Sequence, residues 1–330
     1  MAKTIPATSE GNELVGENAH RTAASANTLG TETTLSEQDW SDLLEKIEGG
    51  NCTPFLGAGA SRTILPTGEN LAELWADKFG FPFPHKRSEL PAVAQFVGIT
   101  KENDIWPKEE VVRSFKRIVS GINLQEAFGQ PNALSTLADL PFPVYMTTNY
   151  DDLLFQALQA KGKNPKFDIC RWNQITKDLP IPSPLKDRKV LFEPSAQCPL
   201  IFHLHGHQRF PQSIVLTEDD YYNFIVAMSQ RPKTNLNTML PPRILQAIKH
   251  GSLLFIGYRL TDLSFLVLFR TLFEESKSGQ QFENLAVQLP HKDGAAAQEY
   301  LRKYGSAPQS VKVGILRGFL KNKEFGLGRC

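Results

Sequence analysis

Short apolar runs alternate with helix-like patterns along most of this chain. Four of the runs are typical of buried strands, and they begin at Cys52, Pro143, Leu200 and Ser252. Each run is followed by glycine or polar residues, and then by a pattern typical of a helix. This order predicts an α/β fold, in which a Rossmann-like, mostly parallel sheet is flanked by helices.

Apolar residues spaced three and four apart predict the helices. Trp40, Leu43, Leu44 and Ile47 define the first of them, and a pair of glycines ends it. Similar patterns predict helices over residues 71–79, 111–119, 153–158, 221–225, 240–249, 265–272 and 295–304.

Two segments interrupt this alternation. Residues 80–140 show no strand pattern, and prolines separate their helical stretches, so we interpret this part, about 80–140, as a helical insertion or subdomain beside the sheet. Residues 162–199 are rich in proline and predict loops. Weaker patterns predict short strands over residues 189–192, 213–217 and 284–289.

The two ends of the chain differ from its middle. Residues 1–34 are rich in Ala, Ser, Thr, Asn, Glu and Gly, which predicts a flexible tail, or an arm that orders on a partner. Residues 314–330 are basic and fit no clear closing element, so residues 311–330 are predicted to be a C-terminal tail, or an end that a partner completes. One α/β domain then spans residues 35–310.

The composition and net charge of the chain limit the kinds of partner that it is expected to bind. The chain has 330 residues, of which 41% are hydrophobic, and its formal net charge is +1. This charge produces no overall field that would attract nucleic acid or an anionic membrane. The apolar runs are too short to span a bilayer, and the N-terminus lacks a secretory pattern. We therefore expect a cytoplasmic protein without direct nucleic-acid or membrane binding.

The four cysteines do not form a metal-binding pattern. Cys52, Cys170, Cys198 and Cys330 include no Cys-x-x-Cys pair, so they cannot build a zinc ribbon. We expect free thiols in a reducing compartment, with Cys52 as a small core residue.

The turn after the first apolar run is a candidate phosphate loop. Gly57, Ala58 and Gly59 follow the run, and Ser61 comes two residues later. The two glycines could adopt positive φ and let the backbone approach a diphosphate with no Cβ between them. Ser61 could cap the next turn or bind a phosphate oxygen. The same spacing also fits an ordinary tight turn, so the loop alone predicts no ligand.

Polar or small residues end the other three predicted strands as well. In a doubly wound parallel sheet, the loops beyond the carboxyl ends of the strands face one crevice. Residues at these four ends should therefore converge, and the pattern predicts a ligand of nucleotide size. Besides the glycine loop, the residues concerned are Thr148, Asn149, Asp151, His205, Gly257 and Tyr258.

As a set, these motifs resemble the sirtuin-like superfamily. They occur in the family order, and the resemblance covers roughly residues 40–290. The closer match is to a bacterial branch that acts in antiviral defence, because residues 204–206 followed by residues 214–221 are typical of that branch. The stretches that carry the resemblance are residues 57–61, 147–151, 205–206 and 255–262.

The resemblance implies an NAD-binding catalytic domain in which each motif has a part. The glycine loop would hold the diphosphate, and Gly257 with Tyr258 would lie along the adenosine half of NAD. Asn149 and Asp151 would contact the nicotinamide ribose or the attacking water, and His205 would be the catalytic base. The cofactor-binding residues expected on this basis are Gly57, Ala58, Gly59, Ser61, Thr148, Gly257 and Tyr258.

Two departures from the deacylating sirtuins indicate which reaction to expect. The deacylases carry a four-cysteine zinc module after the catalytic histidine, whereas residues 207–251 contain no cysteine here. Residues 62–69 also lack the Asp-Phe-Arg run that follows the phosphate loop of the deacylases. The resemblance therefore implies NAD as a substrate, without zinc.

The expected function is that of an NAD+ hydrolase, which converts NAD+ to nicotinamide and ADP-ribose. By resemblance to the defence branch, it would act against phage by depleting NAD and would assemble into a homo-oligomer. A separately encoded sensor or ATPase partner is expected by analogy. The alternatives are an NAD-dependent protein deacylase and a non-catalytic module that binds NAD or ADP-ribose.

Each candidate catalytic residue also has a structural interpretation. His205 could be a buried histidine with satisfied hydrogen bonds. Asn149 could cap the helix that starts near Asp152, and Asp151 could only stabilise that helix start through its charge.

The third predicted strand carries alternating histidines. If the strand continues, His203, His205 and His207 point to the same side and could hold a metal ion, although no acidic or cysteine ligand is near them in sequence. His203 is more simply interpreted as packed within the sheet. Tyr221 and Tyr222 are expected to be core or rim aromatic residues, and Arg259 could meet a phosphate or lie in solvent.

Overall fold

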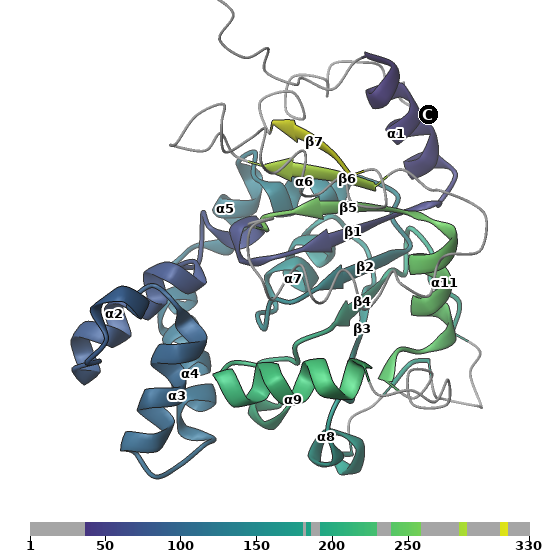
Figure 1. Ribbon diagram of the computed structural model, residues 1–330. Helices are drawn as coiled ribbons and strands as arrows, with labels where there is room; N and C mark the ends of the chain where they lie inside the picture. Colours follow the sequence, from purple (N-terminus) through teal and green to yellow (C-terminus); the bar gives the residue numbers. More distant parts are fainter. Residues whose placement is uncertain are drawn as a thin grey trace, which may run out of the picture. The chain divides into compact units, whose positions relative to one another are not determined.

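The predicted α/β class is confirmed by a seven-stranded parallel sheet (Figure 1). The computed structural model describes residues 37–180, 183–185, 192–229 and 239–258, together with two strands at 284–288 and 311–315. Within these residues the strand order is β3-β4-β2-β1-β5-β6-β7. The strands are β1 Cys52–Leu56, β2 Val144–Thr147, β3 Lys166–Ile169, β4 Leu200–His203, β5 Ser252–Ile256, β6 Asn284–Gln288 and β7 Val311–Ile315.

Helices and short 3-10 turns connect the strands. The described helices are α1 Glu37–Glu48, α2 Gly68–Phe79, α3 Leu90–Thr100, α4 Trp106–Ser120, α5 Leu124–Gly129, α6 Ala133–Asp139, α7 Leu153–Ala160, α8 Gln174–Asp178, α9 Glu218–Ser229 and α11 Pro242–His250. The 3-10 turns are η1 Ala58–Ser61, η2 Pro84–Lys86 and η3 Pro211–Ser213. None of the helices in the described residues is long and apolar enough to cross a membrane.

The sheet separates two apolar clusters, because successive side chains of a strand point to opposite faces. Phe55 of β1 belongs to a cluster that includes Phe224 of α9 and Ile248 of α11. The next residue, Leu56, belongs to the other cluster, which includes Leu137 of α6 and Leu158 of α7. Both faces of the central strands are therefore buried, which explains why their sequences are continuous apolar runs.

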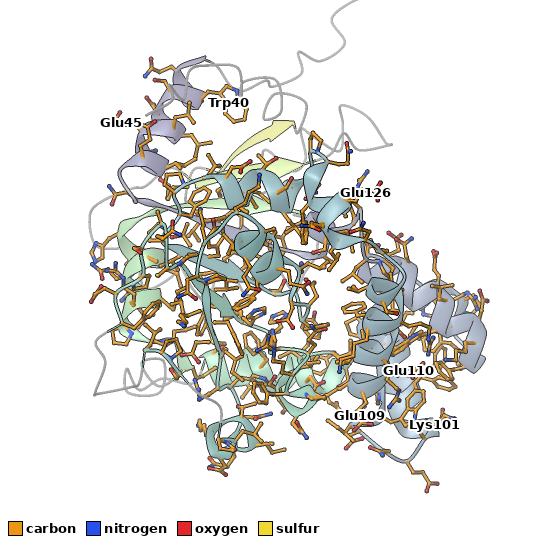
Figure 2. The ribbon with its side chains drawn as sticks, turned by 180° about the vertical axis from the view of Figure 1, so that it is seen from behind. Trp40, Glu45, Lys101, Glu109, Glu110 and Glu126 are labelled. Atoms are coloured by element: carbon orange, nitrogen blue, oxygen red, sulfur yellow. The ribbon has the colours of Figure 1, made fainter. Side chains whose placement is uncertain are left out.

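The insertion predicted at about 80–140 is helical, with no strand among its residues. Together with α2, its first elements form a group beside the sheet, which we call the helical module and define as residues 68–120 (Figure 1). Edge-on packing of the Phe79 ring on the Trp106 ring, 5.4 Å between centroids, joins α2 to α4. The labelled side chains of Lys101, Glu109 and Glu110 lie on this module in Figure 2.

Strand β3 falls in the segment that the proline content predicts to be loops, so the prediction was wrong at residues 166–169. The strand could not be recognised from the sequence because the fully buried Asp168 interrupts its apolar pattern. The Asp168 carboxylate accepts hydrogen bonds from Arg171 at 2.9 Å and from its neighbouring backbone N–H on Ile169 at 2.8 Å. Such pairing makes burial of the charge tolerable.

The strand predicted over residues 213–217 is also wrong. The segment is the end of η3 followed by a loop, although Ile214 and Val215 are fully buried. The N–H of Val215 bonds to the carbonyl of His205 at 3.0 Å, and the N–H groups of the next two residues bond to the Asp220 carboxylate. An apolar run can therefore be buried outside a sheet when other groups satisfy its amides.

The C-terminal part of the chain adds a strand to the sheet. Strand β7 pairs with β6 in parallel, with Val313 opposite Ala286, and it lies inside residues 311–330, which we predicted to be a tail. Alternating β-branched residues at positions 311, 313 and 315 are the signal that this interpretation passed over. The predicted strand at 284–289 is confirmed as β6.

Several predictions lie outside the described residues. They concern the tail at 1–34, most of the strand at 189–192, the helices at 265–272 and 295–304, and Arg259. Of the cysteines, Cys52 and Cys170 are buried free thiols and Cys198 is a half-buried one, while Cys330 is not described.

Candidate functional site

The carboxyl ends of four strands lie side by side at one edge of the sheet. Leu56 at the end of β1 pairs with Thr147 of β2 and with Ile256 of β5. Thr147 in turn pairs with His203 at the end of β4. The motifs that follow these strands therefore leave the sheet at the same edge. The strand order also reverses beside β1, which has β2 on one side and β5 on the other, and ligands of open α/β sheets bind at such a point.

The glycine loop is built against the turn that follows β5. Gly57 has φ −108°, so the positive φ expected there is wrong, and Gly59 is not among the glycines with positive φ either. The left-handed residue is Gly257, with φ +78°. A Cβ on Gly57 would come within 2.8 Å of the Gly257 carbonyl oxygen, and a Cβ on Gly59 within 2.8 Å of the Gly257 Cα. These glycines are needed because two backbones cross there.

Tyr258 connects the ends of three strands. Its hydroxyl lies 2.9 Å from the Leu56 carbonyl oxygen, to which it donates, and 2.9 Å from the Thr148 hydroxyl. Its ring packs against Phe55, with centroids 5.4 Å apart. The residue thus holds β1, β2 and β5 together at the edge where the glycine loop lies.

Asn149 reaches the glycine loop. Its side-chain amide donates to the Ser61 hydroxyl at 3.2 Å, and its own backbone N–H donates to the Thr147 hydroxyl at 2.9 Å. The N-cap of α7 is Asp152, so the alternative role of Asn149 as a helix cap is wrong. Ser61 is almost fully buried, so its hydroxyl holds the Asn149 side chain from the protein interior.

The three alternating histidines do not point the same way, contrary to the expectation for a continuing strand. Strand β4 ends at His203, and Gly206 turns the chain with φ +84°. The rings of His203 and His207 lie together, 4.5 Å between centroids, and His207 stacks on Phe167 at 4.6 Å. His205 lies instead against α9. In the described part of the chain, no group of three or more His, Cys, Asp or Glu residues could hold a metal ion.

A polar cluster that the sequence did not reveal supports the Asn149 loop. His203 donates from Nδ1 to the Asn149 carbonyl oxygen at 2.9 Å. His207 donates from Nε2 to the Asp152 carboxylate at 2.8 Å, and Gln208 donates to its other oxygen at 2.7 Å. Burial opposes ionisation of Asp152, but the hydrogen bond and charge of His207 outweigh it and lower the pKa of this carboxyl. The cluster ties the loop after β2 to the loop after β4.

Asp151 lies at the start of α7. Its carboxylate accepts a hydrogen bond from the Leu153 N–H at 2.9 Å, which matches the structural interpretation of this residue. Burial, and after it the nearby Asp152 charge, raise the pKa of Asp151 to about 6. The carboxyl is thus buried and already bound to the helix.

His205 is 6% exposed and is held by aromatic rings. Tyr221 and Phe224 of α9 lie edge-on to it, with centroids 5.4 and 5.0 Å away. Within the described residues its ring nitrogens make no hydrogen bond, so the interpretation as a satisfied buried histidine finds no protein partner there. Burial lowers the pKa of His205 to about 3, so the imidazole is neutral at pH 7.

Two hydrogen bonds through Val215 connect the loop that contains Asn149 to the turn that contains His205. The hydroxyl of Tyr150, next to Asn149, donates to the Val215 carbonyl oxygen at 2.8 Å. Val215 donates its N–H to the His205 carbonyl oxygen at 3.0 Å. No hydrogen bond in the described residues joins the two candidate side chains directly.

The two buried histidines predict a loss of stability in mild acid. Burial lowers the pKa values of His203 and His205 to about 3, whereas unfolded histidine titrates near pH 6.5. Between these values only the unfolded chain takes up the protons, so stability is lost as the pH falls below about 6.5. Asp151, with its raised pKa of about 6, opposes this with one proton.

We expect a His203→Gln variant to reduce this pH dependence by one proton, or about 1.4 kcal/mol per pH unit near pH 5. Glutamine keeps a polar side chain of similar length but does not titrate. Urea unfolding at pH 7, 6 and 5 measures the slope, and His250→Gln, at an exposed position, is the control. Equal slopes for wild type and His203→Gln would contradict the assignment of a buried neutral imidazole.

Comparisons with known proteins agree with one another. The family described as "SIR2-like domain" matches residues 143–308, which include the motifs after β2, β4 and β5. The "NAD(+) hydrolase ThsA" of Bacillus cereus (strain MSX-D12) is 24% identical over 223 residues, which cover 67% of this chain and 40% of that protein. The protein of the same name from Cytobacillus dafuensis is 23% identical over 184 residues, 56% of this chain and 32% of that protein.

A third relative with this name, from Acinetobacter baumannii (strain 532279), is 29% identical over 90 residues, 27% of this chain and 15% of that protein. The chain thus spans 40% or less of the length of these relatives.

Proposed function

From the premise that this chain belongs to the SIR2-like domain family, we propose that it is an NAD+ hydrolase, which releases nicotinamide and ADP-ribose. The observation that carries the proposal is the alignment of four strand ends, which gathers the glycine loop, Asn149, His205 and Tyr258 at one edge of the sheet. The names of the three relatives support the same reaction.

The chemistry needs few groups. Breaking the bond between nicotinamide and ribose builds positive charge on the sugar, as in glycoside hydrolysis. Nicotinamide leaves as a neutral molecule from a cationic precursor, so a strong general acid is not required. The site must instead orient a water molecule, tolerate positive charge and accept a proton.

The candidate residues match these tasks. The Asn149 amide can orient a water molecule or a ribose hydroxyl, because it carries both donors and an acceptor. The imidazole of His205 is neutral at pH 7 and can accept the proton, but the burial that lowers its pKa to about 3 also makes it a weak base until the cationic substrate and water are bound beside it. Asp151 can contribute negative charge near the developing cation when it is ionised, while its bond to Leu153 fixes its position.

The dinucleotide is proposed to lie along the glycine loop. The N–H groups of Gly57, Gly59 and Ala60 already bond to backbone carbonyl oxygens, so the loop would face the diphosphate with the N–H of Ala58 in the middle of the turn, and Thr148 would add a hydroxyl group. Gly257 and Tyr258 would line the adenosine half. No zinc ion enters this proposal.

The cellular role is a further part of the proposal. The resemblance of residues 204–221 to the antiviral branch supports a cytoplasmic effector that depletes NAD+ during phage infection. Assembly into a homo-oligomer, or contact with a separately encoded sensor or ATPase, would then control its activity.

Product analysis tests the reaction. We expect the full chain, incubated with NAD+ over a range of protein concentrations, to release equal amounts of nicotinamide and ADP-ribose. An Asn149→Ala variant should be slower by about 10²-fold, because it loses a group that orients the reacting atoms. Asn164→Ala is the matched control, since this asparagine has no side-chain hydrogen bond within the described residues.

Other products would point to the other functions. O-acyl-ADP-ribose formed from an acyl-lysine peptide would indicate a deacylase. Saturable binding of NAD+ or ADP-ribose without turnover, at every protein concentration and with every candidate partner, would indicate a binding module and exclude the hydrolase.

A further inference from the structure

Three consecutive acidic residues in the first turn of α9 bind three different elements of the helical module. We call Glu218, Asp219 and Asp220 the acidic clamp. Each of them has a partner far away in the sequence, which no local pattern would require. The pairs are Lys86 of η2 with Glu218 at 3.3 Å, Gln95 of α3 with Asp219 at 2.9 Å, and Lys108 of α4 with Asp220 at 2.6 Å.

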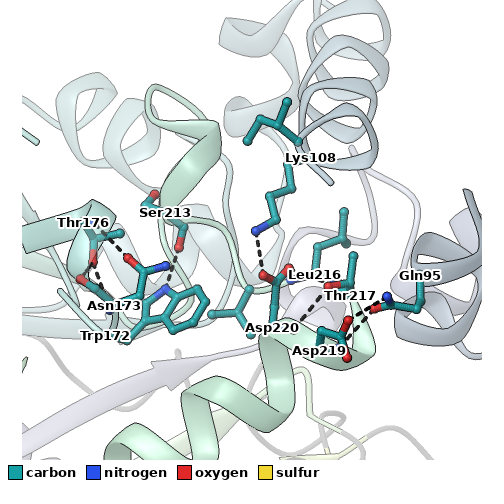
Figure 3. Close-up of polar contacts among 12 residues, drawn as sticks. Gln95, Lys108, Trp172, Asn173, Thr176, Ser213, Leu216, Thr217, Asp219 and Asp220 are labelled. Atoms are coloured by element: carbon teal, nitrogen blue, oxygen red, sulfur yellow. Dashed lines mark hydrogen bonds and ion pairs between the residues drawn. The ribbon is translucent and has the colours of Figure 1, made fainter. Parts of the chain in front are cut away.

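The pair of Lys108 and Asp220 is the buried centre of this clamp (Figure 3). Only 10% of the lysine side chain and 12% of the aspartate side chain are exposed. The second carboxylate oxygen accepts from the N–H groups of Leu216 at 3.1 Å and Thr217 at 3.0 Å. An ion pair removed from water is retained only when its remaining hydrogen bonds are satisfied, and this carboxylate meets that condition.

At the edge of the clamp, Asp219 both donates a hydrogen bond to Gln95 and accepts one from it. Its carboxylate accepts from the Gln95 side-chain amide, and its N–H donates to the Gln95 side-chain oxygen at 3.1 Å. The first turn of α9 is therefore fixed to α3 as well as to α4, as the dashed lines in Figure 3 show.

The turn that the clamp fixes carries the rings that hold His205. Tyr221 follows Asp220 directly, and Phe224 lies one helical turn further on. Both rings lie edge-on to the imidazole. Because no hydrogen bond within the described residues holds the His205 ring, its orientation depends on where α9 lies.

We propose that the helical module positions the imidazole of His205 through the acidic clamp, with Lys108 as the main positioning residue. This inference rests on the proposed function of His205 as the base. A contact on α4 determines where α9 lies, and the rings on α9 determine the orientation of the imidazole that accepts the proton.

Lys108→Met tests the clamp in the full chain, because methionine keeps the length of the side chain and removes its charge. Lys116→Met is the matched control, since this lysine is exposed on the same helix and has no ion pair within the described residues. The first measurement is the rate at which diethyl pyrocarbonate modifies His205, followed by peptide mass mapping with the exposed His250 as internal reference.

We expect Lys108→Met to raise the modification rate of His205 by about tenfold, because local opening becomes more frequent. The kcat for NAD+ should fall by about tenfold, while KM stays within about threefold, since positioning of a base acts on the transition state. Lys116→Met should match the wild type in all three quantities.

The double variant Lys108→Met with Asp220→Asn covers the case in which the single variant fails to fold. It carries no unpaired buried charge, and we expect it to fold and to show the same faster modification of His205. A folded variant in which His205 is modified at the rate of Lys116→Met would overturn the proposal. Because modification requires no turnover, this test also decides the matter if the wild type does not cleave NAD+.

Discussion

Replacing His205 by alanine should lower kcat for NAD+ cleavage by about 10²–10⁴-fold, the usual contribution of a general base. The imidazole is neutral at pH 7 because burial lowers its pKa to about 3, and this is the form that accepts a proton. Its backbone carbonyl, which binds Val215, remains in the variant. The loss should therefore fall on catalysis more than on the fold.

The control for this experiment is His250→Ala, at the exposed end of α11. Nicotinamide release and circular dichroism are measured for both variants and the wild type. If folded His205→Ala keeps more than a tenth of the wild-type kcat, His205 is not the base.

The pH profile of the wild type adds a second check on His205. A histidine with an ordinary pKa near 6.5 would lose most of its base form by about pH 5.5. Because burial lowers the pKa of His205 to about 3, kcat/KM should stay level as the pH falls from 7 to 5.5. A fall centred near pH 6.5 would indicate a solvated imidazole instead.

Gly257→Ala should destabilise the protein by about 3 kcal/mol, the sum of a left-handed backbone cost of about 1 kcal/mol and a steric cost of about 2 kcal/mol. Gly257 has φ +78°, and a Cβ there would overlap the Ala60 nitrogen and lie 2.7 Å from the Gly59 carbonyl carbon. The glycine loop would have to move away from β5, so NAD+ binding should weaken as well.

Gly50→Ala separates the two costs. Gly50 also has a left-handed conformation, with φ +69°, but a Cβ there would meet no atom within 4 Å. This variant should lose only the backbone part, about 1 kcal/mol. Urea unfolding compares the two variants, and equal losses would show that the crossing of the two loops at Gly257 contributes nothing.

Much of the fold could be predicted because the central strands are buried on both faces. Continuous apolar runs identified β1, β2, β4 and β5, and helical periodicity identified α1, α2, α4 and α7. The errors arose in segments whose burial in the structure differs from what their pattern of apolar and polar residues predicts. β3 contains a buried, paired aspartate, and residues 214–216 are buried in a loop whose amides bind His205 and Asp220.

The candidate site could be predicted only as a set of chain positions. Its residues follow strand ends, and the parallel sheet brings strand ends together, so their common edge followed from the fold class. Their individual contacts did not follow. Asn149 binds Ser61, which lies 88 positions earlier, and Tyr258 binds Leu56, 202 positions earlier.

The sequence by itself determined the α/β class, most of the strands and the motifs that end them, because the apolar runs and helical periodicity that indicate buried elements are patterns of neighbouring residues. Only the tertiary structure decided that Gly257 is the left-handed glycine, that His205 turns away from His203 and His207, and that Asp152 belongs to a buried polar cluster. It also decided that the acidic start of α9 binds the helical module. These features depend on which distant segments meet, and a local pattern of residues carries no information about such partners.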